Sequence, residues 1–408
     1  MASINIATPL NNIDYDVTII GGGIHGVGVA QAAAAAGYRV TLIEQKHLAY
    51  GTSRWSSKLI HGGLRYLENF EFGLVRESLK ERELLLKLAP ELVKRQKFYI
   101  PVYENTSRRP WFIGMGLFAY TVLAGGNKHT HFHRIPSSQW ESLDGLDRNG
   151  LDAVLQYTDA QTDDAKLTQA VMNSAIDLGA DLLCPATFEQ ATRVEGGLQV
   201  EYSLNGQSQK LKTRTLVNAA GPWASELLSS ITGELPAFAV DKVQGTHIEL
   251  PGELSQGCYY MEVEKDKRAV FAMPWQGRTL VGTTEFTYED DPHKVHSRDE
   301  AVDYLLEVYQ QHFPKRDLTV LDRWAGLRVL PAQTGTAFKR SRETQMPVDN
   351  EETPTVLSIF GGKLTGYRAT AEKVVKKLQR NLPQVAEKAR TDQLPLSLDG
   401  VKDVSRSN

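Results

Sequence analysis

Short apolar runs rich in β-branched residues alternate along this chain with longer stretches in which apolar residues recur every three or four positions. The first pattern is typical of buried strands and the second of amphipathic helices. Residues 75–88, preceded by Glu71 and stopped by Pro90, predict one helix, and residues 165–178, with Asp163 as the expected cap, predict another. The strand-like runs are VTII, RVTLIE, DLLCPATFEQ, TLVNAAG, RTLVGTT and TVLSIFGG.

The spacing of these runs predicts the fold class. Strands that alternate with helices indicate a parallel sheet covered by helices. Residues 237–288 instead contain closely spaced strands separated by turn residues, as an antiparallel sheet would. We therefore predict an α/β chain (α+β overall), in which an antiparallel-sheet substrate domain is inserted into a Rossmann-like nucleotide-binding domain. The predicted nucleotide-binding domain comprises residues 15–75, 150–230 and 345–382, the substrate domain residues 76–149 and 231–344, and flexible tails residues 1–14 and 383–408.

A glycine-rich turn joins the first predicted strand to the first helix. Gly21, Gly23 and Gly26 fit the pattern G-x-G-x-x-G, and Glu44 closes the next strand. In such a turn the first glycine permits a tight bend, the second lets backbone approach a pyrophosphate, and the third lets helix and sheet pack closely. The carboxylate suits a ribose hydroxyl, and the helix N-terminus favours phosphate. The stretch therefore predicts a dinucleotide site.

Composition narrows the class of protein without identifying it. The chain has 408 residues, a formal net charge of −3, 41% hydrophobic and 23% charged residues, which is ordinary for a globular protein. The charge gives no reason to expect binding to nucleic acid. Cys184 and Cys258 lack CxxC spacing, so we expect neither a disulfide framework nor structural zinc. The N-terminus shows no secretory signal pattern, and a cytoplasmic location is expected.

At several places in the sequence, cationic residues are flanked by glycine or apolar residues. In GTSRWSSKLIHGGLRYLE, two glycines beside Arg65 suit a backbone pressed against a flat ligand and a guanidinium near an anion, although an ordinary polar loop is the alternative. Arg328, Arg342 and Lys363 occur late in the chain. Cations that folding gathers together would bind a phosphate.

Two further segments allow more than one interpretation. His129, His131 and His133 alternate, as metal ligands on one strand face would, but no acid lies nearby, and we predict no metal site. The segment RRPWFIGMGLFAYTVLAGG, residues 108–126, mixes arginines with aromatic residues. It is too short to span a bilayer and fits either an interfacial membrane contact or a core helix.

The motifs together resemble one family, the FAD-dependent glycerol-3-phosphate dehydrogenases of the D-amino-acid-oxidase-like (glutathione-reductase-like) flavoprotein superfamily. The resemblance extends over residues 16–382 and is carried by VTIIGGGIHGVGVA, the long block from GTSRWSSKLIHGGLRYLE to LLLKLAP, YTDAQTDDAKL, LVNAAGPW, FAMPW, VGTTEFTYEDDP, GLRVL and FGGKLTGYR. Members usually continue into a C-terminal helical domain, which the resemblance leads us to expect is missing here. The text after Arg328 also lacks the acidic residues often seen there.

The resemblance implies FAD as cofactor and assigns residues to it. The residues implied for the ADP half of FAD are Gly21, Gly23, Ile24, His25, Gly26, Glu44 and Gln45. Those implied near the pyrophosphate or the flavin ring are Thr52, Ser53, Ser57, Lys58, Leu59, His61 and Gly63. The rest of the cofactor would be lined by Phe188, Ala220, Gly221, Trp223, Gly362, Lys363, Leu364 and Thr365. The implied substrate pocket holds Arg65, Tyr66, His247, Arg328, Arg342 and Lys363.

The implied activity is oxidation of sn-glycerol 3-phosphate to dihydroxyacetone phosphate by hydride transfer to FAD. His247 is a sensible base at neutral pH, and Arg328 would instead stabilise the alkoxide; Arg65 completes the expected catalytic set. A membrane quinone is the implied acceptor, with peripheral contact at the cytoplasmic face of the inner membrane. We keep a homodimer open. Two rival functions also stay open, an FAD-dependent oxidase of an amine, amino acid or other hydroxy acid, and a non-catalytic flavoprotein.

Overall fold

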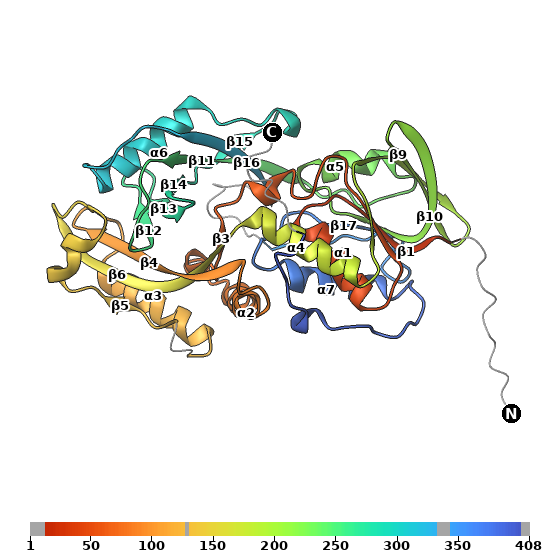
Figure 1. The fold of residues 1–408 in the computed structure, drawn as a ribbon, viewed down its shortest axis with the longest axis horizontal. Coiled ribbons are helices and arrows are strands. Elements are labelled where there is room, and N and C mark those ends of the chain that lie inside the picture. Colours follow the sequence, from red (N-terminus) through yellow and green to blue (C-terminus); the bar gives the residue numbers. More distant parts are fainter. Residues whose placement is uncertain (1–12, 127–129, 333–342, 401–408) are drawn as a thin grey trace.

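The computed structural model describes residues 13–126, 130–332 and 343–400, and in this part the chain folds around two sheets (Figure 1). The first sheet has the strand order β7-β2-β1-β10-β9-β8, with β17 also paired to β10. Strands β7, β2, β1, β10 and β17 are mutually parallel, whereas β8, β9 and the first half of β10 form an antiparallel meander. Its strands are β1 (Tyr15–Ile20), β2 (Val40–Ile43), β7 (Asp181–Leu183), β8 (Ala186–Val194), β9 (Gly197–Leu204), β10 (Gln207–Asn218) and β17 (Val356–Ser358).

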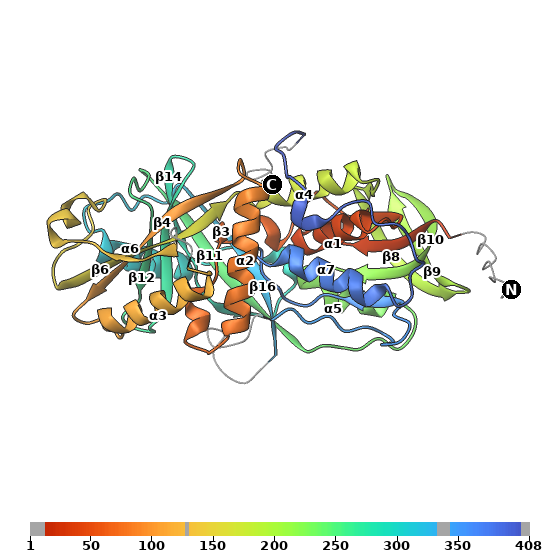
Figure 2. The ribbon, with the colours of Figure 1, turned by 90° about the horizontal axis from the view of Figure 1, so that it is seen from below.

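Each face of the first sheet is covered by a different layer. Helices α1 (Ile24–Ala35), α4 (Asp164–Asp177) and α7 (Tyr367–Leu378) lie together against the parallel strands (Figure 2). A second apolar core on the other face joins the parallel strands to β8 and β9. The parallel sheet with helices predicted from the alternating pattern is thus confirmed, and the fold is of the α/β type.

The second sheet has the order β15-β11-β14-β13-β12-β4-β6-β3, with β16 paired to β11 and β5 to β6. Strands β11 to β15 pair in antiparallel fashion with one another or with β16, as predicted for residues 237–288. The strands are β3 (Leu59–Ile60), β4 (Val93–Tyr103), β5 (His133–Arg134), β6 (Leu151–Thr162), β11 (Val240–Leu250), β12 (Cys258–Glu262), β13 (Ala269–Trp275), β14 (Arg278–Gly282), β15 (Phe286–Tyr288) and β16 (Asp322–Pro331).

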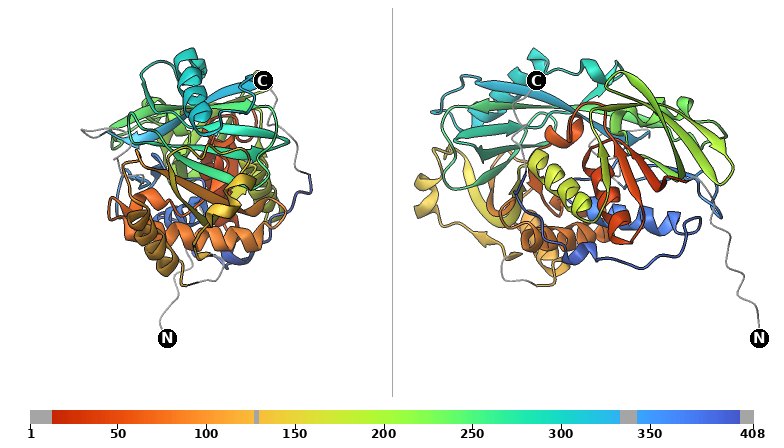
Figure 3. Two further views of the ribbon diagram at one scale, coloured as in Figure 1. Left: turned by 90° about the vertical axis from the view of Figure 1, so that its left-hand side faces the viewer. Right: turned by 45° about the vertical axis from the view of Figure 1, so that its right-hand side comes forward.

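Helices cover both faces of this second sheet. Helix α6 (Asp299–His312) buries its apolar face in one core, whereas α2 (Phe72–Leu88) and α3 (Pro110–Leu123) contribute to the core on the other side. With the left-hand side of Figure 1 turned toward the viewer, α2 and α3, coloured in shades of orange, lie together below the strands (Figure 3, left). The short α5 (Ala224–Leu227) follows β10.

The predicted elements differ from the observed ones mainly at their ends. Helix α2 begins one residue after Glu71, and Asp163 caps α4 by accepting a hydrogen bond from the Lys166 N–H at 3.0 Å. Residues 383–400, predicted as part of a tail, lie against the helical layer, because the Lys388 N–H donates to the Ala35 carbonyl at 2.8 Å and Leu396 is buried. Strands β3 and β6 fall in the predicted nucleotide-binding ranges but pair within the second sheet, so the domain boundaries stay a prediction.

Candidate active site

A cavity of about 600 Å³ lies where the two sheets meet, and it gathers most of the residues that the sequence singled out. Its lining extends from the glycine-rich turn after β1 to strands β11 and β16 of the second sheet. The predicted residues that line it are Gly21, Gly23, Ile24, His25, Glu44, Gln45, Thr52, Ser53, Ser57, Leu59, His61, Arg65, Tyr66, Phe188, Ala220, Gly221, Trp223, His247, Arg328, Gly362, Lys363, Leu364 and Thr365.

The glycine-rich turn has the close contacts that the sequence predicted. Gly21 has a φ of +108°, and a Cβ there would lie 2.6 Å from the Ala219 carbonyl oxygen. A Cβ on Gly26 would lie 1.9 Å from the Gly21 carbonyl oxygen. Gly26 therefore does not line the cavity but lets α1 pack against β1, which brings the N-terminus of α1 to the cavity.

Glu44 follows β2 directly and closes the same end of the cavity. Its two carboxylate oxygens accept hydrogen bonds from the backbone N–H groups of Gly22, at 2.7 Å, and Lys46, at 2.8 Å. Burial raises the pKa of this carboxyl, and the two backbone hydrogen bonds oppose that effect. A carboxylate held in this way can accept a hydrogen bond from a ribose hydroxyl.

Polar atoms without partners along the cavity indicate where a ligand fits. The Nδ1 of His25 and the Nε1 of Trp223 are buried, line the cavity and have no hydrogen-bond partner among the described residues. Burial lowers the pKa of His25 to about 4, so its imidazole is neutral. Together with the glycine turn and Glu44, these groups fit the adenine dinucleotide that the sequence predicted.

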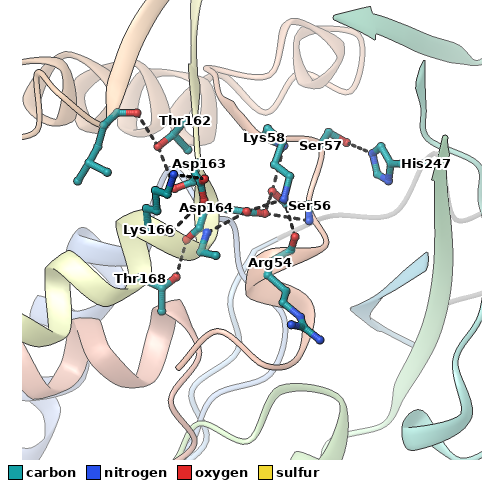
Figure 4. Close-up of polar contacts among 12 residues, drawn as sticks. Arg54, Ser56, Ser57, Lys58, Thr162, Asp163, Asp164, Lys166, Thr168 and His247 are labelled. Atoms are coloured by element: carbon teal, nitrogen blue, oxygen red, sulfur yellow. Dashed lines mark hydrogen bonds and ion pairs between the residues drawn. The ribbon is translucent and has the colours of Figure 1, made fainter. Parts of the chain in front are cut away.

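Lys58 is directed away from the cavity. Its ammonium group is buried and donates to the Asp164 carboxylate at 2.7 Å and to the Arg54 carbonyl at 2.5 Å (Figure 4). Asp164 also accepts from the Ser56 hydroxyl at 2.6 Å. The sequence placed Lys58 on the cofactor surface, but in the structure this ion pair fixes the loop that leads to Ser57, and Lys58 does not line the cavity.

Gly63 does not line the cavity but lies directly before residues that do. It has a φ of +78°, and a Cβ there would lie 2.1 Å from the Tyr66 ring. Gly63 opens the short 3₁₀ helix Leu64–Leu67, which carries Arg65 and Tyr66 into the cavity lining. The Lys363 ammonium lies 3.7 Å from the centre of the Tyr66 ring, as a cation–π contact requires.

His247, on β11, is the buried imidazole at the second-sheet end of the cavity. Its Nε2 lies 2.9 Å from the Ser57 Oγ (Figure 4). Its ring stacks on Trp324 of β16. Burial, followed by the charges of Lys58 and Arg328, lowers the pKa of His247 to about 3. The imidazole is therefore neutral at physiological pH and can accept a proton.

A cluster of three arginines around one carboxylate lies beside His247. Glu285 accepts a hydrogen bond from Arg328 at 3.0 Å, and its carboxylate lies 3.7 Å from Arg268 and 3.9 Å from Arg65. Only 5% of the Glu285 side chain is exposed, whereas Arg65, Arg268 and Arg328 retain 17–21%. Among the described residues the cluster therefore has an excess of two positive charges, and its partly exposed cations line the cavity.

Two members of this cluster, Glu285 and Arg268, are not among the residues that the sequence predicted. Glu285 lies in the link between β14 and β15, far along the chain from Arg65 and Arg328, so no local sequence signal marked it as their partner. Arg268 precedes β13 in the charged text EKDKR, which is typical of a solvated turn. Arg342, which the sequence assigned to the pocket, lies outside the described residues. Among the described residues no group of three metal-binding side chains gathers, and His129 also lies outside them.

Comparisons with known proteins agree with this geometry. A protein-family profile described as FAD dependent oxidoreductase matches residues 16–362. A glycerol-3-phosphate dehydrogenase of Pseudomonas aeruginosa is 39% identical over 383 residues, which cover 91% of this chain and 73% of the relative. A D-erythritol 1-phosphate dehydrogenase of Brucella abortus is 35% identical over 382 residues, with 91% and 74% covered.

A solved structure extends the likeness to three dimensions. The X-ray structure of the glycerol-3-phosphate dehydrogenase from Bacillus halodurans complexed with FAD has a TM-score of 0.74 and 27% identity, and the match covers 94% of this chain and 68% of that one. The sequence-based expectation of FAD is thus confirmed at the level of the family. The chain belongs to the FAD-dependent oxidoreductases, within the family of the glycerol-3-phosphate dehydrogenases.

Proposed function

We propose that this protein oxidises sn-glycerol 3-phosphate to dihydroxyacetone phosphate with FAD as the hydride acceptor. The observation that carries the proposal is the cluster of Arg65, Arg268 and Arg328 around Glu285, at the cavity end that also holds His247. A dianionic phosphate fits a site with two excess positive charges better than a single carboxylate would, because each charge-assisted hydrogen bond to phosphate adds to the attraction.

Binding the phosphate fixes the position of the alcohol carbon. Guanidinium groups hold phosphate in a defined orientation, and this lowers the entropic part of the barrier. FAD, when bound, would supply the acceptor for the hydride of the secondary alcohol carbon. The residues that would hold FAD are those of the glycine turn, Glu44 and the segment around Gly362, which line the same cavity.

His247 is the group that accepts the hydroxyl proton. Its imidazole is neutral, and the Ser57 hydroxyl is within hydrogen-bond distance of its Nε2. Arg328 is one of the charges that depress its pKa. A bound phosphate that pairs with Arg328 offsets this charge, so that substrate binding raises the pKa of His247 and makes it a better base. Arg328 also stabilises the alkoxide that forms as the proton leaves.

D-Erythritol 1-phosphate is the second candidate substrate. Like glycerol 3-phosphate, it carries a phosphate group and a secondary alcohol. The relative that is 35% identical to this chain is a D-erythritol 1-phosphate dehydrogenase. An amine or amino-acid oxidase remains the main rival from another class of substrate, since it would use the same cofactor site.

For the electron acceptor we propose a quinone dissolved in the membrane. Helix α3 buries only Leu117 and Tyr120 among its described residues. Its other face exposes large hydrophobic side chains, with 65% of Trp111 and 64% of Phe118 accessible. A surface of this kind suits the interface of a bilayer. Among the described residues there is no helix long and apolar enough to cross one.

A second cavity supports this route for electrons. It has a volume of about 530 Å³ and is lined mostly by apolar side chains, which come from residues 64–72, β4 and α3. It shares Leu64, Arg65 and Tyr260 with the first cavity. An apolar acceptor entering from the α3 face would therefore approach the first cavity. Arg108 is engaged in ion pairs with Glu68 and Glu262, whereas the exposed Arg109 is available to anionic lipid headgroups.

Anaerobic bleaching of the flavin absorbance tests the substrate proposal. The panel contains glycerol 3-phosphate, D-erythritol 1-phosphate, glycerol and small amino acids. We expect rapid bleaching by glycerol 3-phosphate and none by glycerol, because glycerol has no phosphate for the arginine cluster. Bleaching by an amino acid alone would replace the proposal with the oxidase. Faster bleaching by D-erythritol 1-phosphate would identify the second candidate as the substrate.

A further inference from the structure

The hydroxyl group of Tyr120 links α3 to the loop at Gly62 and to β6, and through β6 to α2. Tyr120 is 1% exposed, and its hydroxyl accepts the Gly62 N–H at 2.8 Å and donates to the Asp159 carboxylate of β6 at 2.7 Å. The other Asp159 oxygen accepts from Arg82 of α2 at 2.6 Å. The buried chain of hydrogen bonds therefore begins at the loop before Arg65 and ends at a buried guanidinium.

The loop that Tyr120 holds belongs to the first cavity. His61 and Arg65 both line the cavity, and Gly62 lies between them. The His61 N–H donates to the Thr365 hydroxyl at 3.1 Å, so that two successive backbone N–H groups are held by hydroxyls from distant segments. A Cβ on Gly62 would lie 2.5 Å from the Tyr120 hydroxyl, so the loop approaches α3 too closely for any side chain at this position.

The direction of these hydrogen bonds is fixed by charge. Asp159 is paired with Arg82 and accepts a hydrogen bond from the Tyr120 hydroxyl, which leaves a lone pair of the Tyr120 oxygen for the Gly62 N–H. Burial raises the pKa of Tyr120 well above its usual value, so the hydroxyl keeps its proton. Without this hydroxyl the Gly62 N–H loses its acceptor, and a buried backbone donor needs one.

We propose that Tyr120 is a positioning residue for substrate binding, which acts through Gly62 on the place of Arg65 in the cavity. The proposal rests on the proposed function, because it assigns Arg65 to the substrate phosphate. It also means that α3, whose outer face exposes aromatic side chains, fixes the substrate loop with its inner face.

The test compares Tyr120→Phe with Tyr103→Phe in the FAD-loaded protein. Tyr103 is a matched control, because its hydroxyl donates to the Asp147 carbonyl at 2.9 Å and does not line the cavity. We expect Tyr120→Phe to lower kcat/KM for glycerol 3-phosphate with a soluble dye about tenfold or more, since small displacements of a positioning group cost this much. It should weaken the binding of inorganic phosphate in parallel, and Tyr103→Phe should change neither.

A double-mutant cycle with Arg65→Ala separates positioning from general destabilisation. If Tyr120 acts through Arg65, Tyr120→Phe should cost less than about twofold once Arg65 is absent. An equal loss in both backgrounds, or a loss no larger than that of Tyr103→Phe, would overturn the role of Tyr120. If Tyr120→Phe fails to fold, Asp159→Asn enters the same cycle. Its amide reverses the polarity toward the Tyr120 hydroxyl, so the same non-additivity is expected.

The two proposals fail in different ways. A wild-type protein that binds phosphate but does not oxidise glycerol 3-phosphate contradicts the proposed function, and the phosphate affinities of the four proteins in the cycle still decide the role of Tyr120. A wild-type protein that oxidises glycerol 3-phosphate while the cycle is additive contradicts the role of Tyr120 alone.

Discussion

Replacing His247 by asparagine should flatten the dependence of folding stability on pH. The pKa of His247 falls from its ordinary 6.5 to about 3 in the folded protein, chiefly through burial and also through the charges of Lys58 and Arg328. Between pH 6.5 and 3, His247 is therefore protonated in the unfolded chain but stays neutral in the folded chain. Stability is lost as the pH falls from 6.5 toward 3 and is fully present above 6.5.

The size of the effect follows from the width of this window. Each pH unit inside it is worth about 1.4 kcal/mol for one group. Between pH 7.5 and 5.0, the free energy of unfolding changes through His247 only below pH 6.5. The wild type therefore loses about 2 kcal/mol of its free energy of unfolding through this one group. The buried carboxyls of Asp159 and Asp164, whose pKa values burial raises, oppose this trend. They do so equally in the variant, so the difference between the two proteins isolates His247.

Urea unfolding of the FAD-saturated proteins at pH 7.5, 6.5 and 5.0 measures this difference. We expect the wild type to lose about 2 kcal/mol more than His247→Asn between the outer pH values, with equal m-values. His133→Asn is the control, because His133 is exposed, and it should follow the wild type. Parallel stability curves for the wild type and His247→Asn would refute the reasoning and mean that His247 titrates near its ordinary pKa after folding.

The remaining predictions concern the cofactor, the cations and the acceptor. Acid precipitation of the purified yellow protein should release FAD into the supernatant; FMN, a nicotinamide cofactor or no cofactor would contradict the dinucleotide site. Arg65→Ala and Arg328→Ala should each lower kcat/KM for glycerol 3-phosphate by an amount equivalent to about 1.5–3 kcal/mol while FAD stays bound, because each removes a charge-assisted bond to phosphate; unchanged values would remove these cations from the pocket. Lys58→Met leaves a buried carboxylate without its cation and should destabilise the protein by about 3–5 kcal/mol, seen as a lower Tm; an unaltered Tm would mean that the ion pair is dispensable. Phe118→Ser should weaken liposome binding and quinone reduction but not dye reduction, whereas Ile176→Ser, at an exposed position on α4, should change none of them; equal behaviour of the two variants would show that the α3 face is not the membrane contact.

The sequence by itself determined the features that depend on interactions between residues close together along the chain. The glycine-rich turn, Glu44 at the end of β2 and the Asp163 cap each depend on residues within one strand–turn–helix unit. Their dihedral preferences, helix-end hydrogen bonds and apolar periodicity operate over a few positions. The alternation of strands and helices likewise predicted the parallel sheet, because each element must bury its apolar face against a neighbour.

Only the tertiary structure decided which charges face each other. Lys58 and Lys363 both stand in motifs that suggested the cofactor, yet Lys58 is drawn into a buried ion pair with Asp164, 106 positions further along the chain. Glu285 gathers Arg65, from a segment more than 200 residues earlier, at 3.9 Å. A buried charge must find an opposite charge or polar partners wherever the fold supplies them. That choice depends on strand register and helix packing across the whole chain, and no local pattern contains it.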